Sequence, residues 1–266
     1  MYQYTLQIIG EEEPVEIIDC HAHVTASGQW FDTPYEASIE NLEEAMARSG
    51  IARAVLIPLG HASIEDVRFC LDLAKKQPEK FAVVPQINVA ELSLLTEYKD
   101  VVAGLKVHPS LQQVDPASPE VQEILDAASG MGKPVVFDTF MQSTTIPIRL
   151  LDPKVFDELA KNRRDITFVL AHSCWPHLLD AYIIAKANKN VYLDLSYFGK
   201  AADNTYLLHD FCHLLEKLDQ KAIFGTDFPE VDVAAYTALW QRYLHHLPED
   251  KQKRIFSDNA REVFRL

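Results

Sequence analysis

The stretch IIDCHAH, from Ile17 to His23, joins a short apolar run to two histidines spaced two residues apart. Successive side chains of a β-strand point to opposite faces, so residues two apart share one face. His21 and His23 therefore project together from the end of this strand and can bind one ion. A histidine pair without function would be expected on a polar surface, and not at the end of a buried strand. We predict that both are metal ligands.

Seven more apolar runs follow, and amphipathic runs lie between them. We expect strands at Glu16–Cys20, Ala52–Ile57, Phe81–Ile87, Val101–Val107, Pro134–Asp138, Ile166–Ala171, Val191–Leu195 and Lys221–Gly225. Each is apolar along most of its length, as strands buried on both faces are. We expect helices at Ala37–Ser49, Ile64–Lys76, Pro119–Ser129, Pro153–Lys161, His177–Lys186, Asn204–Leu218, Val233–Leu247 and Pro248–Phe264.

This alternation predicts crossover units and a parallel sheet. Eight units favour a closed barrel, and the glycine-rich first turn of an open doubly wound sheet is missing from the sequence. The length of 266 residues also suits an α/β barrel, which typically has about 250 residues. We therefore predict one α/β domain over residues 1–266, a single-domain (β/α)8 TIM barrel with a C-terminal helix.

Composition limits the partners and the compartment. The net charge of −14 repels phosphate backbones, so we expect no nucleic acid partner. The cysteines Cys20, Cys70, Cys174 and Cys212 are scattered and form no CxxC pair, which is typical of reduced thiols in the cytoplasm. Residues 1–10 lack the basic region of a signal peptide, and no apolar run approaches the roughly 20 residues that span a membrane.

Polar side chains stand at the ends of five of the expected strands. In a (β/α)8 barrel the functional site is built at these C-terminal ends. Besides the histidine pair, the strand ends carry Lys106, His108, Asp138, His172 and Asp227. We expect all of these side chains to meet at one mouth of the barrel.

Each of them has a functional and a structural interpretation. Asp227 can bind the metal and take a proton from water, or cap the following turn. His172 can be a third or fourth ligand or a general acid or base, or a buried histidine bonded to the backbone. Lys106 and His108 share one strand face and can bind a substrate carboxylate or polarise a carbonyl, or be a loop lysine and a structural histidine. Because Asp227 is expected opposite the histidine pair, its metal role is favoured over the capping role.

With these residues in view, the chain resembles the amidohydrolase superfamily of metal-dependent barrel enzymes. It is most similar to the amidohydrolase 2 branch, which includes aminocarboxymuconate-semialdehyde decarboxylase, related aromatic acid decarboxylases and lactone hydrolases acting on pyrone dicarboxylate. The resemblance covers nearly the whole chain. Its motifs are IDCHAH at 18–23, GLKVHP at 104–109, VLAH at 169–172, NVYLDLS at 190–196, IFGTDFP at 223–229 and DNAREVF at 258–264.

The resemblance implies one divalent metal ion, usually zinc, bound by His21, His23, Asp227 and a histidine at the end of strand five. It makes His172 the catalytic histidine or a further ligand. This sequence departs from the pattern, because Asp138 stands where the strand-five histidine is expected, followed by Thr139 and Phe140. Asp138 either ligates zinc or manganese itself, or holds His172 or a water, or marks a degraded site.

The working hypothesis is a hydrolase of carbon–oxygen or carbon–nitrogen bonds. Water activated by the metal would attack an ester, lactone or amide of a small carboxylated substrate, with Asp227 taking the proton. His172 or Lys106 would stabilise the oxyanion. Candidate pocket residues are Trp175, Tyr197 and Glu230, and Arg149 is a candidate for binding a substrate carboxylate. The alternative for Trp175 and Tyr197 is that they are packing residues.

Two other functions stay open. One is non-oxidative decarboxylation of an aromatic or unsaturated acid, which would use the same ligands. The other is a catalytically degraded barrel with a relic metal site that serves as a binding or scaffold protein. We expect a small-molecule substrate and no membrane partner. The sequence shows no interface signature, so a homodimer also stays open.

Overall fold

The structure is a computed structural model that describes residues 15–60, 63–141, 143 and 145–266. The segment 1–10, in which we expect no signal peptide, lies outside the described residues. Within the described residues, no helix is both long and apolar enough to cross a membrane.

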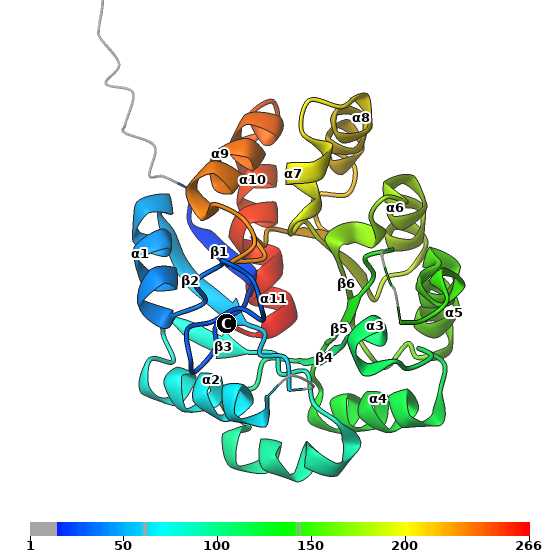
Figure 1. The fold of residues 1–266 in the computed structure, drawn as a ribbon. Helices are drawn as coiled ribbons and strands as arrows, with labels where there is room; N and C mark the ends of the chain where they lie inside the picture. Colours follow the sequence, from blue (N-terminus) through cyan, green and yellow to red (C-terminus); the bar gives the residue numbers. More distant parts are fainter. Residues whose placement is uncertain (1–14, 61–62, 142, 144) are drawn as a thin grey trace, which may run out of the picture.

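Within this part of the chain, eight strands form a ring surrounded by helices, and Figure 1 shows this arrangement along the barrel. Every strand that the sequence predicts is present, although several are shorter than expected. The strands are β1 (Ile17–Ala22), β2 (Ile51–Leu56), β3 (Phe81–Val83), β4 (Leu105–Val107), β5 (Val135–Asp138), β6 (Phe168–Ala171), β7 (Val191–Asp194) and β8 (Ala222–Ile223).

All ladders between neighbouring strands are parallel, in the orders β1-β2-β3 and β4-β5-β6-β7-β8. Isolated bridges join the two sets into one barrel. Val83 pairs with Val102 between β3 and the chain leading to β4, and Ala22 pairs with Phe228 between β1 and the segment after β8. Cys20 N also donates to Phe224 O at 3.0 Å. The predicted (β/α)8 barrel is confirmed.

Helices follow the strands, and most of them lie on the outside of the ring. They are α1 (Ile39–Ser49), α2 (Ile64–Lys76), α3 (Pro109–Gln112), α4 (Pro119–Met131), α5 (Pro153–Asn162), α6 (Leu178–Ala187), α7 (Phe198–Ala202), α8 (Tyr206–Leu215), α9 (Val233–Leu244), α10 (Glu249–Lys253) and α11 (Asn259–Phe264). Short 3-10 helices are η1 (Val89–Tyr98), η2 (Ile148–Leu151) and η3 (His172–Cys174), and η4 (Arg254–Asp258) is a π-helix.

Several helical segments differ from the prediction, and the short α3, α7, η2 and η3 form where we predicted no helix. Between β3 and β4 the chain forms η1 where we predicted no helix. Helix α4 runs through Gly130 and ends at Gly132, whose φ of 62° lets it close the helix by donating to Ala128 O and Ser129 O. The predicted helix Pro248–Phe264 is interrupted by the π-turn η4, so that it forms α10 and α11.

The barrel interior is filled with small and medium apolar side chains, such as Ile18, Val55 and Val136, in one buried cluster. Ala260, Val263 and Phe264 of α11 belong to the same cluster, and Figure 1 shows α11 within the ring of strands. The C-terminal helix therefore closes one end of the barrel. The polar strand ends lie at the other end, where the cavity described below opens.

Candidate metal centre

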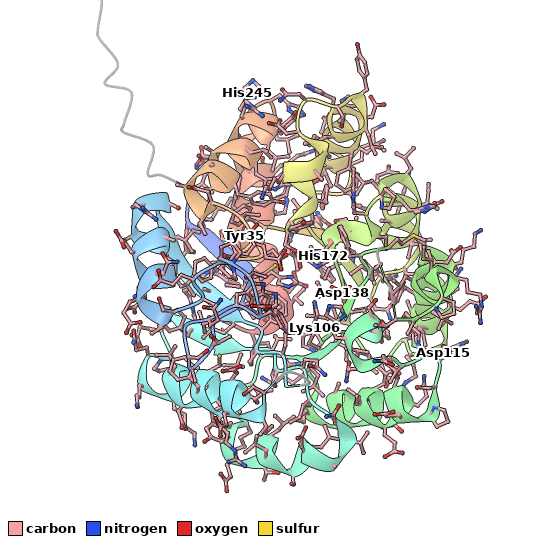
Figure 2. The ribbon with its side chains drawn as sticks, viewed as in Figure 1. Tyr35, Lys106, Asp115, Asp138, His172 and His245 are labelled. Carbon is pink, nitrogen blue, oxygen red and sulfur yellow. The ribbon has the colours of Figure 1, made fainter. Side chains whose placement is uncertain are left out.

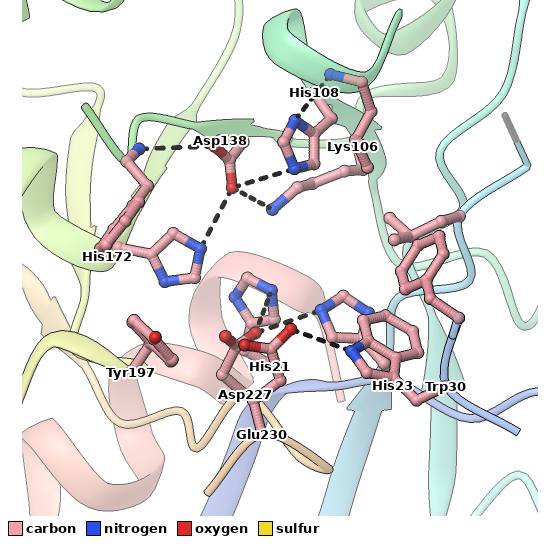
Figure 3. A pocket seen from close by; sticks show the side chains of 14 residues that line it. His21, His23, Trp30, Lys106, His108, Asp138, His172, Tyr197, Asp227 and Glu230 are labelled. Carbon is pink, nitrogen blue, oxygen red and sulfur yellow. Dashed lines mark hydrogen bonds and ion pairs between the residues drawn. The ribbon is translucent and has the colours of Figure 1, made fainter. Parts of the chain in front are cut away.

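A cavity of about 350 Å³ opens at the C-terminal ends of the strands. Its polar lining comes from β1, β4, β5, β6 and the segment after β8. Figure 2 shows Lys106, Asp138 and His172 near the middle of the barrel, whereas Asp115 and His245 lie at the periphery. Figure 3 shows how the lining side chains converge: His21, His23, Lys106, His108, Asp138, His172 and Asp227. The structure thus brings together every predicted residue that stands at a strand end.

A local irregularity of β1 sets the direction of the two histidines. The register of β1 against β2 shifts between Asp19 and Ala22, as in a β-bulge. Cys20, before the shift, packs in the barrel interior, whereas Ala22 packs in the outer core. His21 and His23 both line the cavity. Bulges commonly redirect side chains beside functional sites.

Asp194 determines which nitrogen of His21 faces the cavity. The Nδ1 atom of His21 lies 2.5 Å from Asp194 Oδ2, and Ser196 Oγ lies 3.2 Å from the same nitrogen. Burial lowers the pKa of His21 well below its usual value, so this imidazole is neutral and its single proton is held at Nδ1 by the carboxylate. The lone pair on Nε2 is therefore free to bind a cation.

His23 is oriented in the same way by a backbone carbonyl. Its Nδ1 lies 2.6 Å from Ile57 O, an atom that only accepts hydrogen bonds, so Nδ1 carries the proton. The Nε2 atom of His23 then faces Asp227 Oδ1 at 3.1 Å. The ring is also stacked on Trp30, with centroids 4.7 Å apart.

The position of Asp227 completes a set of donor atoms that fits a divalent cation. Its Oδ1 lies 3.3 Å from His21 Nε2 as well as 3.1 Å from His23 Nε2, so both Nε2 atoms face one carboxylate oxygen. Among the described residues, the buried Nε2 of His21 has no hydrogen-bond partner. A nitrogen lone pair that faces a carboxylate oxygen is repelled by it unless a cation lies between them. Two imidazoles and a carboxylate suit zinc or manganese.

His172 lies beside this set and is bonded through both ring nitrogens. One donor atom each of His21, His172 and Asp227 lie within 4.8 Å of one another. However, His172 Nε2 lies 3.1 Å from Asp138 Oδ2, and Nδ1 lies 3.0 Å from Ser196 Oγ. Burial alone would lower the pKa of His172, but the carboxylates of Asp227 and Asp138 raise it to about 9.

Asp138 lies at the centre of three cationic or imidazole groups. Besides His172, its Oδ2 lies 3.8 Å from Lys106 Nζ and 3.6 Å from His108 Nε2. Burial would raise the pKa of Asp138, but these three neighbours lower it well below its usual value. Burial also lowers the pKa of His108 to about 4. The buried Lys106 ammonium therefore has its counter-charge on Asp138.

Two site residues have a backbone conformation that residues other than glycine seldom adopt. Asp227 has a φ of 75° and His172 a φ of 60°, both in the left-handed region. The strain is offset by hydrogen bonds: Asp227 N donates to His21 O at 2.7 Å, and Thr226, beside it, donates its N and Oγ1 to Asp19. These contacts hold Asp227 against β1. Strained residues held in this way are common at functional sites.

The four predicted pocket residues differ in where they lie. Tyr197 and Glu230 line the cavity. Trp175 instead stacks on Phe198 with ring centroids 6.1 Å apart, so the packing interpretation of Trp175 holds. Arg149 is exposed on η2, and neither it nor Trp175 is among the described residues that line the cavity. The structure therefore does not bring Arg149 and Trp175 to the cavity with the other predicted site residues.

Other residues in contact with the site were not assigned roles from the sequence. Asp194 and Ser196 stand at the end of β7, where the strand-end rule that identified His172 would have found them. Trp30 comes from the loop after β1, and its Nε1 donates to Glu230 Oε1 at 2.9 Å. No local pattern marks Trp30, because its role depends on how that loop folds over the barrel mouth.

Comparison with known proteins agrees with this geometry. A family model described as Amidohydrolase matches residues 18–266, and the chain belongs to this family, the amidohydrolase 2 group. Amidohydrolases are enzymes, and two of the three solved structures described below carry the names of enzymes. No curated protein matches the sequence.

Three solved structures share the fold. An uncharacterised TIM-barrel protein from Bordetella bronchiseptica has a TM-score of 0.78 and 20% identity over 93% of this chain and 98% of its own. A probable 2-pyrone-4,6-dicarboxylic acid hydrolase from Acinetobacter baumannii, with citric acid bound, has a TM-score of 0.70 and 15% identity over 94% and 100%. The 5-carboxyvanillate decarboxylase from Novosphingobium aromaticivorans was solved in complex with manganese and a nitrobenzoic acid derivative. It has a TM-score of 0.68 and 13% identity over 96% of this chain and 97% of its own.

Proposed function

We propose that this protein is a metal-dependent hydrolase that cleaves an ester, lactone or amide of a small carboxylated substrate. The observation that carries the proposal is that the Nε2 atoms of His21 and His23 converge on Asp227 Oδ1, with that of His21 left without a hydrogen-bond partner among the described residues. His21, His23 and Asp227 would hold the ion. A zinc or manganese ion at this place supplies a Lewis acid that polarises a carbonyl oxygen and makes water more acidic.

The protein's own groups would divide the proton transfers. Burial would raise the pKa of Asp227, but the charge of His172 and the hydrogen bond with His23 lower it to about 2, so this carboxylate is ionised and can pass a proton on without retaining it. His172, with its pKa raised to about 9, carries a proton at neutral pH and can give it to the leaving group. Its two hydrogen-bonded nitrogens support this acid role over a role as ligand.

Asp138 would act as a positioning residue. Its contact with His172 supports the second interpretation of this aspartate, in which it holds the histidine and does not ligate the ion. Lys106 and His108 remain the candidates for binding a substrate carboxylate, because both line the cavity beside Asp138. The size of about 350 Å³ suits a small molecule.

The second candidate is non-oxidative decarboxylation. A protonated His172 at the cavity can also deliver a proton to carbon, and the fold is shared with a decarboxylase. We further propose that the protein acts in the cytoplasm, because the four cysteines are buried free thiols.

The test measures metal and reaction products on the same sample. The protein is treated with a chelator, reloaded with zinc or manganese, and assayed for metal per chain and for turnover of a lactone panel and of hydroxybenzoate-type acids. We expect about one ion per chain, hydrolysis of at least one lactone, and loss of both in His21→Ala. His177→Ala, at an exposed histidine, is the matched control.

Carbon dioxide release without hydrolysis would replace the first function with the second. Metal that stays sub-stoichiometric after reloading, with no effect of His21→Ala, would reject both and favour a relic site.

A further inference from the structure

Glu230 gives the cavity a second anionic end. At the first end, Asp138 is surrounded by Lys106 and His172. Glu230 borders the same cavity from the segment after β8, on the side where Figure 3 shows Asp227 and Trp30. Among the described residues, no ion pair involves its carboxylate, and the nearby Lys200 Nζ donates to the backbone oxygen of Glu230 at 3.3 Å.

Trp30 fixes the orientation of this carboxylate. Its indole Nε1 donates to Glu230 Oε1 at 2.9 Å. The indole ring is stacked on His23 at 4.7 Å and contacts Phe31 edge-on at 4.6 Å. Trp30 is only 5% exposed, and its N donates to Tyr35 O within the hairpin after β1. Glu230 is thus held by a side chain that is itself immobilised against a candidate metal ligand.

The hydrogen-bonding capacity of Glu230 is mostly unused. An ionised carboxylate offers about four acceptor positions, and the indole takes one of them. A substrate hydroxyl, amine or amide N–H that reaches Glu230 would fill another. A substrate carboxylate at the same place would meet a like charge in a partly enclosed cavity, where such repulsion is strong.

The rest of the lining offers little compensation for a second substrate anion. No arginine is found among the described residues that line the cavity, and Lys106, its one lysine, already faces Asp138. Leu59, Leu111 and Phe140 make up apolar parts of the wall. The groups of the lining that carry positive charge, Lys106 and His172, both contact Asp138, so this lining favours one substrate carboxylate at that end.

We propose that Glu230, held by Trp30, is a specificity residue that accepts a hydrogen bond from a donor group of a small substrate and excludes a second carboxylate there. This inference rests on the proposed function, since it concerns the substrate of the same site. It narrows the substrate class to compounds with at most one carboxylate and, at the far end, a hydroxyl, amine or amide N–H.

Binding of matched probes tests the proposal. Isothermal titration of the zinc-loaded protein compares 3-hydroxybenzoate and 3-aminobenzoate with isophthalate, which carries a carboxylate in place of the donor. In the wild type, we expect the donor-bearing probes to bind at least about tenfold more tightly than isophthalate. Glu230→Gln keeps an oxygen for the Trp30 indole but removes the charge, so we expect the ratio to fall close to one, mainly through tighter binding of isophthalate.

Two further variants separate specificity from folding. Glu36→Gln makes the same substitution at an exposed carboxylate of the hairpin that carries Trp30, and we expect the wild-type ratio. Trp30→Phe keeps an aromatic ring against His23 but removes the indole N–H, and we expect a lower ratio with an unchanged metal content. The affinity ratio is the readout that a merely structural role would not change.

The inference is overturned if the wild type fails to bind the donor-bearing probes, binds all three probes equally, or keeps its ratio in Glu230→Gln. Its failure differs from failure of the proposed function. A protein that hydrolyses lactones without a Glu230-dependent ratio loses only this inference. A protein that shows the ratio, holds zinc and hydrolyses nothing loses only the hydrolase proposal.

Discussion

The two ring nitrogens of His21 show how single residues make this site. Nδ1 is committed to Asp194, and only for that reason does Nε2 present a lone pair to the cavity. Strand periodicity was enough to predict that His21 and His23 act together. Asp194 lies 173 residues away from His21, so no local pattern connects the two. Asp194 belongs to the motif NVYLDLS at 190–196, which marks the family resemblance but not this contact.

The orienting role of Asp194 gives the first prediction. Asp194→Asn keeps the shape of the side chain but removes the charge that holds the proton on His21 Nδ1. We expect the affinity for zinc to fall about 10- to 100-fold, as is typical when a group that orients a metal ligand is lost. Competition with a fluorescent chelator measures it. Asp210→Asn, at an exposed aspartate of α8, is the control, and an unchanged affinity in Asp194→Asn would contradict the role.

The second prediction concerns His172 and pH. In the folded chain its pKa is raised to about 9, against a usual value of 6.5, by Asp227 and Asp138. Between these values the folded protein binds a proton that the unfolded chain does not, so the free energy of unfolding falls as pH rises. The contribution is fully present below pH 6.5 and is lost above about pH 9.

Urea unfolding in excess chelator, which keeps metal from competing for these groups, measures this effect. We expect the decline in wild-type stability between pH 6.5 and about 9 to become shallower in His172→Gln. Parallel curves for the two proteins would show that His172 is not protonated in the folded state.

At the scale of elements, strand ends and the turns after them place the chemistry. The sequence predicted all eight strands because buried parallel strands are continuously apolar, a signal that does not depend on distant contacts. It overestimated β8, which spans only Ala222–Ile223. Beyond β8, Gly225 passes close to the side chains of Asp194 and His21.

Gly225 supplies the third prediction. A Cβ there would lie 2.8 Å from Asp194 Oδ1 and 3.0 Å from His21 Cβ, too close for real contacts. Gly225→Ala should therefore displace the Asp194 carboxylate and lower zinc affinity by about tenfold or more. Gly130→Ala is the matched control, since nothing lies within 4 Å of its added Cβ and it sits inside α4.

The control has its own expected result. Alanine in place of Gly130 should raise the free energy of unfolding by about 0.5–1 kcal/mol, because glycine inside a helix is destabilising. Zinc affinity should stay at the wild-type value. Equal zinc affinities in both variants would show that the space above Gly225 is not needed for the site.

At the scale of the whole molecule, α11 closes the barrel at the end away from the cavity. Phe264 is buried among the interior side chains of the strands. The sequence predicted a C-terminal helix, but the break at η4 that lets α11 pack there became visible only in the tertiary structure. The helix α11, which packs into the barrel core, and the cavity with the candidate metal ligands therefore lie at opposite ends of the barrel.

This separation gives the fourth prediction. Phe264→Ala should lower the free energy of unfolding by about 3–5 kcal/mol, the usual cost of emptying a buried phenylalanine site. Zinc affinity of the folded protein should not change. Urea unfolding and chelator competition measure the two effects, and Tyr206→Ala, at a side chain that is 89% exposed, should change neither. A loss of zinc affinity in folded Phe264→Ala would contradict the separation.

The sequence by itself predicted the barrel and placed His21, His23 and Asp227 at strand ends as candidate metal ligands, because strand period and apolar runs are local properties of the chain. Only the tertiary structure decided how these donors are used. It paired Asp138 with His172 and Lys106, placed Asp194 behind His21 and set Glu230 under Trp30. These are contacts between segments far apart in the chain, and the closure of the barrel creates them.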